Sequence, residues 1–350
     1  MSVIVSTLLS INLDERTEVG KTDHTSLRSL EICAGGGGQA LGLEQAGFEH
    51  VMLIERNPNA CATLKANRPD WNVLEMDLRA FHPEGYPEVS GIDLLAGGVP
   101  CTPYTVAGHQ IGEEDDRDLF PEVIRLAEAL SPRAIMIENV DNLLRKQGFS
   151  AVRERVVKEL VSLDYVVEWR LLDAQNFGVP QRRVRSVLVA LRPEHHVRFC
   201  WPVPTPATQT VGQVLRDSMA SRGWPEADKW AARADETAPT IVGGSEKRGG
   251  GDLGPDRAKS IWCRLGVNGS SIEDEVPGPE FVMRDGVGRK GREGLPKLTT
   301  PQVALLQGFP ADWKFVGKKT ARYRQVGNAF PPPVAAAVGR EIAAALRPAP

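Results

Sequence analysis

The chain has 350 residues, of which 41% are hydrophobic and 25% are charged, and its formal net charge is −3 at pH 7. This composition fits a globular protein with one large and one smaller domain, and the overall charge does not indicate a nucleic-acid-binding protein. No apolar run reaches the length of a membrane span, so we expect no association with a membrane.

Five cysteines are scattered along the chain and never form a CxxC pair. This pattern argues against a zinc site and against a disulfide framework, so we expect no metal and a reducing, cytoplasmic location. Residues 1–26 lack the basic start and the cleavage site of a signal peptide. We therefore predict a flexible tail there.

Strand and helix signals alternate from residue 27 onward. Apolar runs predict strands at 27–32, 51–54, 73–76, 92–96, 134–137, 166–172 and 184–191. Helical periodicity predicts helices at 39–46, 59–67, 119–130 and 152–163. This alternation indicates βαβ units, and hence an α/β domain over residues 27–192 with a parallel sheet.

The composition changes after residue 192. Residues 193–298 are rich in Gly, Pro, Ser, Arg and Lys, which predicts irregular loops over a small scaffold. The large apolar residues of this segment include Trp224, Trp230, Trp262 and Phe281. They supply enough apolar mass for a separate small domain. A last helix is predicted at 333–346, so we expect residues 299–350 to return to the first domain.

The segment Gly98-Val99-Pro100-Cys101 places a cysteine directly after the predicted strand at 92–96. Ligands of open α/β sheets bind outside the carboxyl ends of the strands, so we expect Cys101 to face that cleft. A thiolate there can act as a nucleophile, although a lone cysteine is more often a small buried hydrophobe. The motif alone leaves both interpretations open.

A glycine-rich turn at residues 34–38 joins the first predicted strand to the first helix. Glycines let the backbone approach a ligand, and the helix N-terminus adds hydrogen-bond donors. Glu55 ends the second strand, where a carboxylate suits the two hydroxyls of a ribose. Asp77 follows the third strand and suits either an adenine amino group or a helix N-cap. These residues predict an adenosine-containing ligand and leave a dehydrogenase open.

Two further polar motifs lie next to predicted strands. Glu138-Asn139-Val140 follows the strand at 134–137, where a carboxyl group can exchange hydrogen bonds with a substrate ring. Gln181-Arg182-Arg183-Val184-Arg185 opens the last strand, and strand alternation puts Arg183 and Arg185 on one face. Two arginines there can clamp an anion or orient Glu138, or can simply be solvated.

In this order the motifs resemble those of the DNA (cytosine-5) methyltransferases of bacterial restriction–modification type. The turn at 34–38 is similar to the family's S-adenosylmethionine loop, and the loop at 98–101 to its nucleophile loop. The motifs at 138–140 and 181–185 look like its Glu-Asn-Val and Gln-Arg-Arg-x-Arg elements, and Gln325-Val326-Gly327-Asn328-Ala329 like the segment that completes the cofactor pocket. The resemblance spans about residues 27–345.

The resemblance implies a Rossmann-like S-adenosylmethionine-dependent methyltransferase sheet with helices on both faces, and a smaller, irregular target-recognition domain at 193–298. It implies catalytic roles for Cys101, Glu138, Arg183 and Arg185. The positions that would line the cofactor site are Ile32, Cys33, Ala34, Gly36, Gly38, Glu55, Arg56, Asp77, Leu78, Pro100, Leu119, Asn328 and Phe330. The candidates for DNA contact are Thr240, Gly243, Gly244, Arg248, Lys259, Arg322 and Arg324.

The mechanism that the resemblance implies starts with attack of Cys101 on C6 of a cytosine flipped out of the duplex. Glu138 would hold N3 of the ring, and Arg185 would support the ring carbonyl and the Glu138 carboxylate. Arg183 would lie close to a phosphate or to the glutamate. The base that removes the C5 proton is not identified.

Three departures from the family pattern concern the loops. The family usually has Phe at the position of Cys33, Gln or Pro at that of Thr102, and Phe-Ser where this chain has Tyr104-Thr105. These changes conserve shape or a hydroxyl group. We therefore expect them to alter rate and loop geometry more than the type of reaction.

The resemblance implies S-adenosyl-L-methionine as cofactor, double-stranded DNA as partner, a monomer, and a cognate restriction endonuclease that acts separately. A tRNA cytosine-5 methyltransferase is one alternative, but the Cys-Phe-Thr tripeptide of that branch is absent from the long insert. An inactive module that binds S-adenosylmethionine and DNA is another, and the intact Cys101, Glu138 and Arg185 disfavour it. No nicotinamide-side group explains the same residues, which disfavours a dehydrogenase.

Overall fold

A computed structural model describes residues 26–100, 118–206, 209–243, 251–288 and 290–348. The tail predicted at 1–26 therefore lies almost entirely outside the described residues. A seven-stranded sheet has the order β3-β2-β1-β4-β5-β7-β6. The strands are β1 (Leu27–Ile32), β2 (Phe48–Glu55), β3 (Val73–Glu75), β4 (Leu94–Gly98), β5 (Ala134–Val140), β6 (Val166–Asp173) and β7 (Val184–Leu191).

The first five strands of the sheet are parallel, as the alternation of signals predicts, but β7 runs antiparallel to both β5 and β6. Only ten residues, 174–183, connect β6 to β7. A parallel crossover needs a dozen residues or more, so this connection is too short for one. As a result, the residues that lead into β7 lie at the same edge of the sheet as the end of β5.

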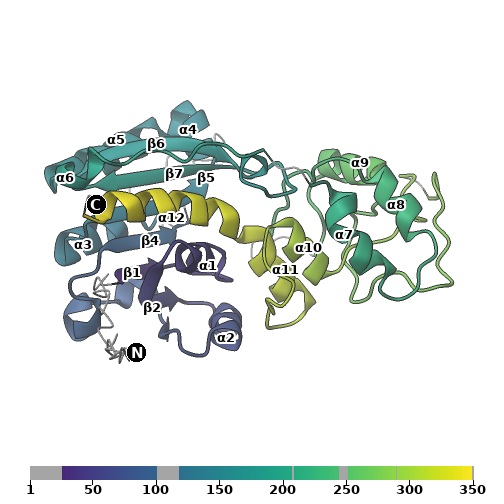
Figure 1. The fold of residues 1–350 in the computed structure, drawn as a ribbon, viewed down its shortest axis with the longest axis horizontal. Coiled ribbons are helices and arrows are strands. Elements are labelled where there is room, and N and C mark those ends of the chain that lie inside the picture. Colours follow the sequence, from purple (N-terminus) through teal and green to yellow (C-terminus); the bar gives the residue numbers. More distant parts are fainter. Residues whose placement is uncertain (1–25, 101–117, 207–208, 244–250, 289, 349–350) are drawn as a thin grey trace, which may run out of the picture.

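Helices cover both faces of the sheet (Figure 1). The helices of this domain are α1 (Gly38–Gln45), α2 (Pro58–Asn67), α3 (Phe120–Leu130), α4 (Asn142–Arg145), α5 (Ser150–Ser162) and α6 (Pro193–His196). One face packs with α3 and α5 around Leu30, Leu126 and Val156, and the other packs with α1 and α12 (Pro332–Leu346). Because each fully buried aliphatic side chain stabilises by about 1.5–3 kcal/mol, these two layers hold the sheet rigid.

The small domain lies at one end of the molecule (Figure 1). Its helices are α7 (Val211–Ala220), α8 (Ala227–Arg233) and α9 (Asp256–Arg264). Trp224, Trp230 and Trp262 are buried together at its centre. The helices were not predicted, although Thr210 and Gln213 form a capping box at the start of α7, a pattern that is visible in the sequence.

The C-terminal segment is shared between the two domains. Helices α10 (Thr300–Leu306) and α11 (Lys319–Asn328) pack in the core that holds the three tryptophans, whereas α12 packs on α1. A Cβ on Gly42 would lie 2.4 Å from the carbonyl oxygen of Pro332, so α1 and α12 cross in close contact. The division at residue 299 stays a prediction. Among the described residues, no helix is long and apolar enough to cross a membrane.

Candidate active site

The candidate site lies where β4 and β5 end. The two strands are parallel neighbours, and Gly98 of β4 is in register with Glu138 of β5. A Cβ on Gly98 would lie 3.2 Å from Oε2 of Glu138, so the glycine leaves room for the carboxyl group. Cys101 comes three residues after the end of β4 and lies outside the described residues, as do Thr102, Tyr104 and Thr105.

Glu138 is a buried carboxyl group with one basic neighbour in contact. Only 9% of the residue is exposed, and Oε1 lies 2.9 Å from Nε of Arg185. Burial raises the pKa of Glu138, and the positive charges of Arg185 and Arg183 offset only part of this rise. A carboxyl group with a raised pKa can donate a proton to a substrate ring at neutral pH.

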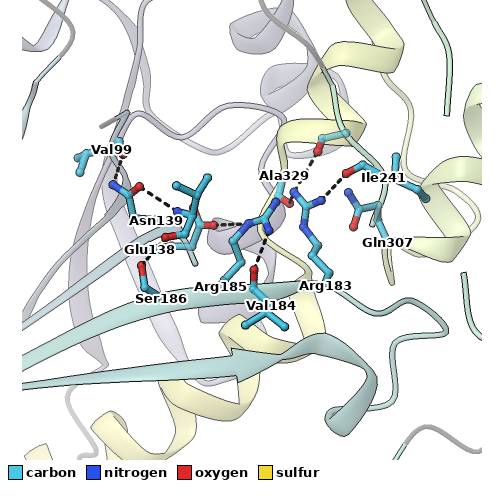
Figure 2. A network of polar contacts seen from close by, with 12 residues as sticks. Val99, Glu138, Asn139, Arg183, Val184, Arg185, Ser186, Ile241, Gln307 and Ala329 are labelled. Carbon is cyan, nitrogen blue, oxygen red and sulfur yellow. Dashed lines mark hydrogen bonds and ion pairs between the residues drawn. The ribbon is translucent and has the colours of Figure 1, made fainter. Parts of the chain in front are cut away.

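Arg185 is held by the start of β7. Its side chain is 12% exposed, and besides its bond to Glu138 it donates from Nη1 to the carbonyl oxygen of Val184 at 2.8 Å. Figure 2 shows the guanidinium between these two acceptors. The predicted pairing of Arg185 with Glu138 is therefore present in the structure. Its antiparallel strand brings the arginine to the glutamate from the opposite side of β5 to Gly98.

Asn139 connects β5 to the loop that follows β4. Its Nδ2 donates to the carbonyl oxygen of Val99 at 2.9 Å, two residues before Cys101 (Figure 2). On the other side, Ser186 donates from Oγ to the carbonyl oxygen of Val140 at 2.9 Å. No role was predicted for Asn139, because a single asparagine in a strand carries no pattern that identifies its partner. The asparagine fixes the direction in which the chain leaves β4.

Arg183 does not contact Glu138. Its Nη1 donates to the carbonyl oxygen of Ile241 at 2.6 Å, and its Nη2 donates to the carbonyl oxygens of Gly327 and Ala329 at 2.9 Å each. Figure 2 shows this guanidinium beside that of Arg185 but with different acceptors. The prediction placed Arg183 close to a phosphate or to the glutamate. The structure directs its hydrogen bonds to backbone carbonyls, while its positive charge still acts on Glu138.

The glycine turn after β1 is tied to the end of β2. Gly35 donates from its backbone N–H to Oε2 of Glu55 at 2.7 Å, and Asn57 donates to Oε1 of the same carboxylate at 2.7 Å. A Cβ on Gly35 would meet only the carbonyl oxygen of Cys33, at 3.9 Å, so the outer side of this turn is open. Each oxygen of Glu55 accepts one hydrogen bond here and keeps a further lone pair, which fits a ligand that carries two hydroxyl groups.

Cys33 precedes this turn and has a φ of 52°, in the left-handed region that few non-glycine residues adopt. Burial, followed by the negative charges of Glu55 and Asp77, raises the pKa of the Cys33 thiol far above its usual range. The thiol therefore stays protonated. For this reason Cys33 is not a candidate nucleophile.

Two aromatic residues for which no role was predicted, and Gln325 of the predicted cofactor segment, hold the turn from behind. Trp313 donates from Nε1 to the carbonyl oxygen of Gly36 at 3.1 Å. A Cβ on Gly36 would lie 2.9 Å from the ring of Phe315. Gln325 accepts from Oγ1 of Thr63 at 2.7 Å and so ties α11 to α2. Aromatic residues in a loop follow no period, so no sequence pattern indicates this support.

The other predicted cofactor positions fall into two groups. The buried ones are Ile32, Ala34, Gly36, Gly38, Leu78, Leu119 and Phe330. The partly or fully exposed ones are Arg56, Asp77, Pro100 and Asn328. Asp77 accepts from the backbone N–H of Arg79 at 3.0 Å, which is the N-cap interpretation, while its other oxygen lies 3.8 Å from Arg56. The cap leaves this second oxygen with only an exposed ion pair.

Glu31 provides a test of whether this region fits a polar ligand. It lies in β1 two residues before Cys33, it is fully buried, and among the described residues neither of its carboxyl oxygens has a hydrogen-bond partner. Burial raises its pKa well above the usual range. Nε2 and Oε1 of Gln39, in the first turn of α1, also have no hydrogen-bond partner among the described residues. Unmatched polar groups are costly in a closed core, so they fit a site that binds a polar molecule.

Of the predicted DNA contacts, Thr240 and Gly243 lie beside the site. Thr240 donates from Oγ1 to the carbonyl oxygen of Arg182 at 2.7 Å, and a Cβ on Gly243 would lie 2.5 Å from the carbonyl oxygen of Arg324. Lys259 and Arg322 form ion pairs with Asp252 and Asp274, at 2.7 and 3.4 Å respectively. Gly244 and Arg248 lie outside the described residues.

The comparison with solved structures identifies the class of fold first, the Rossmann-like methyltransferase fold. DNMT2 of Spodoptera frugiperda, solved as a mutant, is 18% identical with a TM-score of 0.62, covering 91% of this chain and 99% of that one. Dnmt2 methyltransferase of S. pombe is 21% identical with a TM-score of 0.59, covering 88% and 95%. At these identities the likeness shows the fold alone.

The family follows from the sequence comparison. The model of the C-5 cytosine-specific DNA methylases matches residues 27–344, so the chain belongs to this family and is a DNA (cytosine-5) methyltransferase. Type II methyltransferase M.NaeI of Lentzea aerocolonigenes is 50% identical over 322 residues, which are 92% of this chain and 76% of the relative. Type II methyltransferase M.NgoMIV of Neisseria gonorrhoeae is 49% identical over 322 residues, which are 91% and 98%. The resemblance drawn from the motifs is confirmed.

Proposed function

We propose that this enzyme is a Type II methyltransferase that methylates C5 of a cytosine within a specific sequence of double-stranded DNA, as one half of a restriction–modification system. Two relatives near 50% identity that bear the name Type II methyltransferase support the proposal. The single observation that carries the chemistry is the buried Glu138–Arg185 pair, next to the strand end from which Cys101 follows.

The reaction starts at Cys101 in this proposal. Its thiolate adds to C6 of the cytosine, which breaks the aromaticity of the ring and moves electron density toward N3 and C5. Glu138, whose pKa is raised by burial, donates a proton to N3 and neutralises the charge that builds there. Arg185 holds the ring carbonyl and keeps the glutamate in place. C5 would then take the methyl group, a base takes the C5 proton, and the Cys101–C6 bond breaks, which restores the aromatic ring and returns the N3 proton to Glu138.

S-adenosylmethionine supplies the methyl group, activated by its positively charged sulfur. The residues that would hold it are those of the open turn at Gly35, the carboxylate of Glu55 toward the ribose, and Asp77 toward the adenine. Asn328, which is exposed at the end of α11, would complete the pocket. Cys33 would only pack against this cofactor.

None of these groups can reach a base inside a duplex, so the cytosine must be flipped into the site. Thr240, Gly243 and Arg324 lie at the junction of the two domains and are proposed to contact the DNA there. Phosphate contacts would position the duplex, and a minority of contacts to base edges would read the sequence. The enzyme is proposed to act as a monomer in the cytoplasm, with an endonuclease that acts separately.

Methylation and target are tested together by expressing the enzyme in bacteria without cytosine methylation and sequencing the bisulfite-treated DNA. We expect protection of one cytosine within one recurring sequence. Expression of Cys101→Ser should abolish the protection. The proposal would be overturned if the DNA of cells that express the wild-type enzyme contained no protected cytosines, or if only the tRNA of these cells were protected.

The covalent step has its own test. A duplex with the mapped target, in which 5-fluorocytosine replaces the methylated base, should form an adduct with the enzyme that survives denaturation, because fluorine cannot leave as the proton does. Cys101→Ser should form none. An adduct that persists in this variant would refute the role of Cys101.

A further inference from the structure

The backbone of Ile241 is held at both its polar groups by side chains that precede β7. Its N–H donates to Oε1 of Gln181 at 2.9 Å, and its carbonyl oxygen accepts from Nη1 of Arg183 at 2.6 Å. Both side chains are buried, with at most 1% of each residue exposed. Ile241 belongs to the small domain, whereas residues 181 and 183 lead directly to Arg185 and the target pocket.

Backbone hydrogen bonds join the same two segments. Ala238 donates to the carbonyl oxygen of Pro180 at 2.8 Å, and Arg182 donates to that of Ala238 at 2.9 Å. The hydroxyl of Thr240 donates to the carbonyl oxygen of Arg182. Residues 238–241 are therefore fixed to residues 180–183 along their whole length.

The same side chains reach a third segment, at the end of α11. Nη2 of Arg183 donates to the carbonyl oxygens of Gly327 and Ala329, on either side of Asn328. Nε2 of Gln181 donates to Oε1 of Gln307 at 2.8 Å, and Nε2 of Gln307 donates to the carbonyl oxygen of Val326 at 2.8 Å. We call Gln181, Arg183 and Gln307 the clamp.

The chemistry of Arg183 indicates that the clamp is more than packing. Burial lowers the pKa of Arg183, which means that the interior disfavours its charge. Among the described residues its hydrogen bonds go to three backbone carbonyls, whose dipoles stabilise the cation where a carboxylate would otherwise do so. An apolar residue would fill the space without this cost but would leave three carbonyls in two segments without this donor.

We propose that Gln181 and Arg183 are positioning residues that join the segment at 238–243, the segment at 327–329 and the strand of Arg185 into one unit. DNA that settles against Thr240 and Gly243 then also fixes Asn328 and Arg185, so that target DNA and cofactor bind cooperatively. This inference rests on the proposed function and adds to it the route by which its two binding sites communicate.

The test measures the dissociation constant of S-adenosylhomocysteine by calorimetry, with the free enzyme and with its complex with a duplex that carries the mapped target. In the wild type we expect the duplex to tighten binding about tenfold, a usual size of coupling between two sites. In Arg183→Met the ratio should fall to about one. Arg183→Lys keeps a donor but cannot reach all three carbonyls, so its ratio should lie between.

Arg133→Met is the matched control. Arg133 also donates to a backbone carbonyl, that of Leu346, and it forms an ion pair with Asp93. These bonds lie at the amino ends of β4 and β5, at the opposite edge of the sheet from the site. This substitution should lower the melting temperature and leave the ratio unchanged. Should Arg183→Met fail to fold, Gln181→Met, which removes the bonds of this side chain to Ile241, Leu306 and Gln307, should show the reduced ratio. A wild-type ratio of one, or a wild-type ratio retained in the Arg183 and Gln181 variants, overturns the clamp. A wild type that methylates no DNA overturns the proposed function and the clamp together.

Discussion

At the scale of single residues, Glu138 and Arg185 show how burial and charge are balanced for a reaction. The arginine is close enough to orient the carboxyl group, yet burial still raises the pKa of Glu138. A fully solvated pair would leave the glutamate ionised and unable to protonate a ring. The balance depends on Gly98 as well, because any larger residue there would push into the carboxyl group.

Glu138→Gln should therefore lower the rate of methyl transfer by about 10²–10⁴-fold, the usual size of a general acid contribution. The wild-type rate should fall as pH rises through the raised pKa of Glu138, and the variant should lose this fall. Single-turnover transfer of labelled methyl groups measures both. Glu168→Gln, at the far edge strand β6, should behave as the wild type. A variant rate equal to the wild-type rate would contradict the role of Glu138.

Glu31 makes the stability of the protein depend on pH. Its pKa is raised in the folded state, so its contribution to stability is full below the unfolded pKa and is lost as pH rises toward the folded pKa. Glu31→Gln should remove this loss, and its melting temperature should fall less than that of the wild type between about pH 4 and pH 8. Glu154→Gln, at an exposed position of α5, is the control and should leave the change of melting temperature with pH as in the wild type. The prediction would be contradicted if the melting temperatures of Glu31→Gln and the wild type fell equally with pH.

At the scale of elements, the antiparallel β7 decides which arginines can act. In a parallel strand it is the carboxyl end that lies at the ligand edge of the sheet, whereas the amino end of β7, with residues 181–185, lies at that edge here. The apolar runs predicted the sheet, because buried strands leave a clear pattern, whereas the Glu138–Arg185 pair was implied by the resemblance to the methyltransferase family and was left open by the charged residues alone. The direction of Arg183 could not be predicted, since its partners are backbone carbonyls of segments 58 and more residues away. The antiparallel turn was predictable in principle from the shortness of 174–183.

Asn139→Ala should release the loop that leads to Cys101. Loss of the hydrogen bond to Val99 should cost about 1 kcal/mol in the free energy of unfolding. Methyl transfer should slow, with the dissociation constant of S-adenosylhomocysteine unchanged. Ser186→Ala is the control, because it removes the neighbouring bond to Val140 at a similar cost and leaves Val99 held. Equal rates in the two variants would contradict a role for Asn139 in the loop.

At the scale of the whole molecule, the two domains share one core. Tyr323 and Val326 of α11 pack with Trp230 and Trp262 of the small domain, while Gln325 of the same helix is tied to α2. The Gly- and Pro-rich composition ends near residue 298, which predicted a domain boundary at residue 299. A change in composition does not reveal that α10 and α11, which follow this boundary, pack into the core of the small domain, which precedes it.

Because of this shared core, Trp230→Ala should weaken both DNA and S-adenosylhomocysteine binding. Removal of a buried tryptophan should cost about 3–5 kcal/mol. The wild type should unfold in one calorimetric transition, with equal calorimetric and van't Hoff enthalpies. Two separate transitions, or a variant that loses only DNA binding, would mean that the domains are independent.

Trp313 gives the molecule a built-in optical reporter. Its indole is 6% exposed, its N–H bonds the carbonyl of Gly36, and its ring would be 2.8 Å from a Cβ on Gly37. Indole emission responds to the polarity and hydrogen bonding of its surroundings, so any ligand that shifts the turn at 34–38 changes the fluorescence of this residue. Comparison of the wild type with Trp313→Phe isolates that signal from the other six tryptophans. Occupation of the turn can therefore be followed in real time without a label.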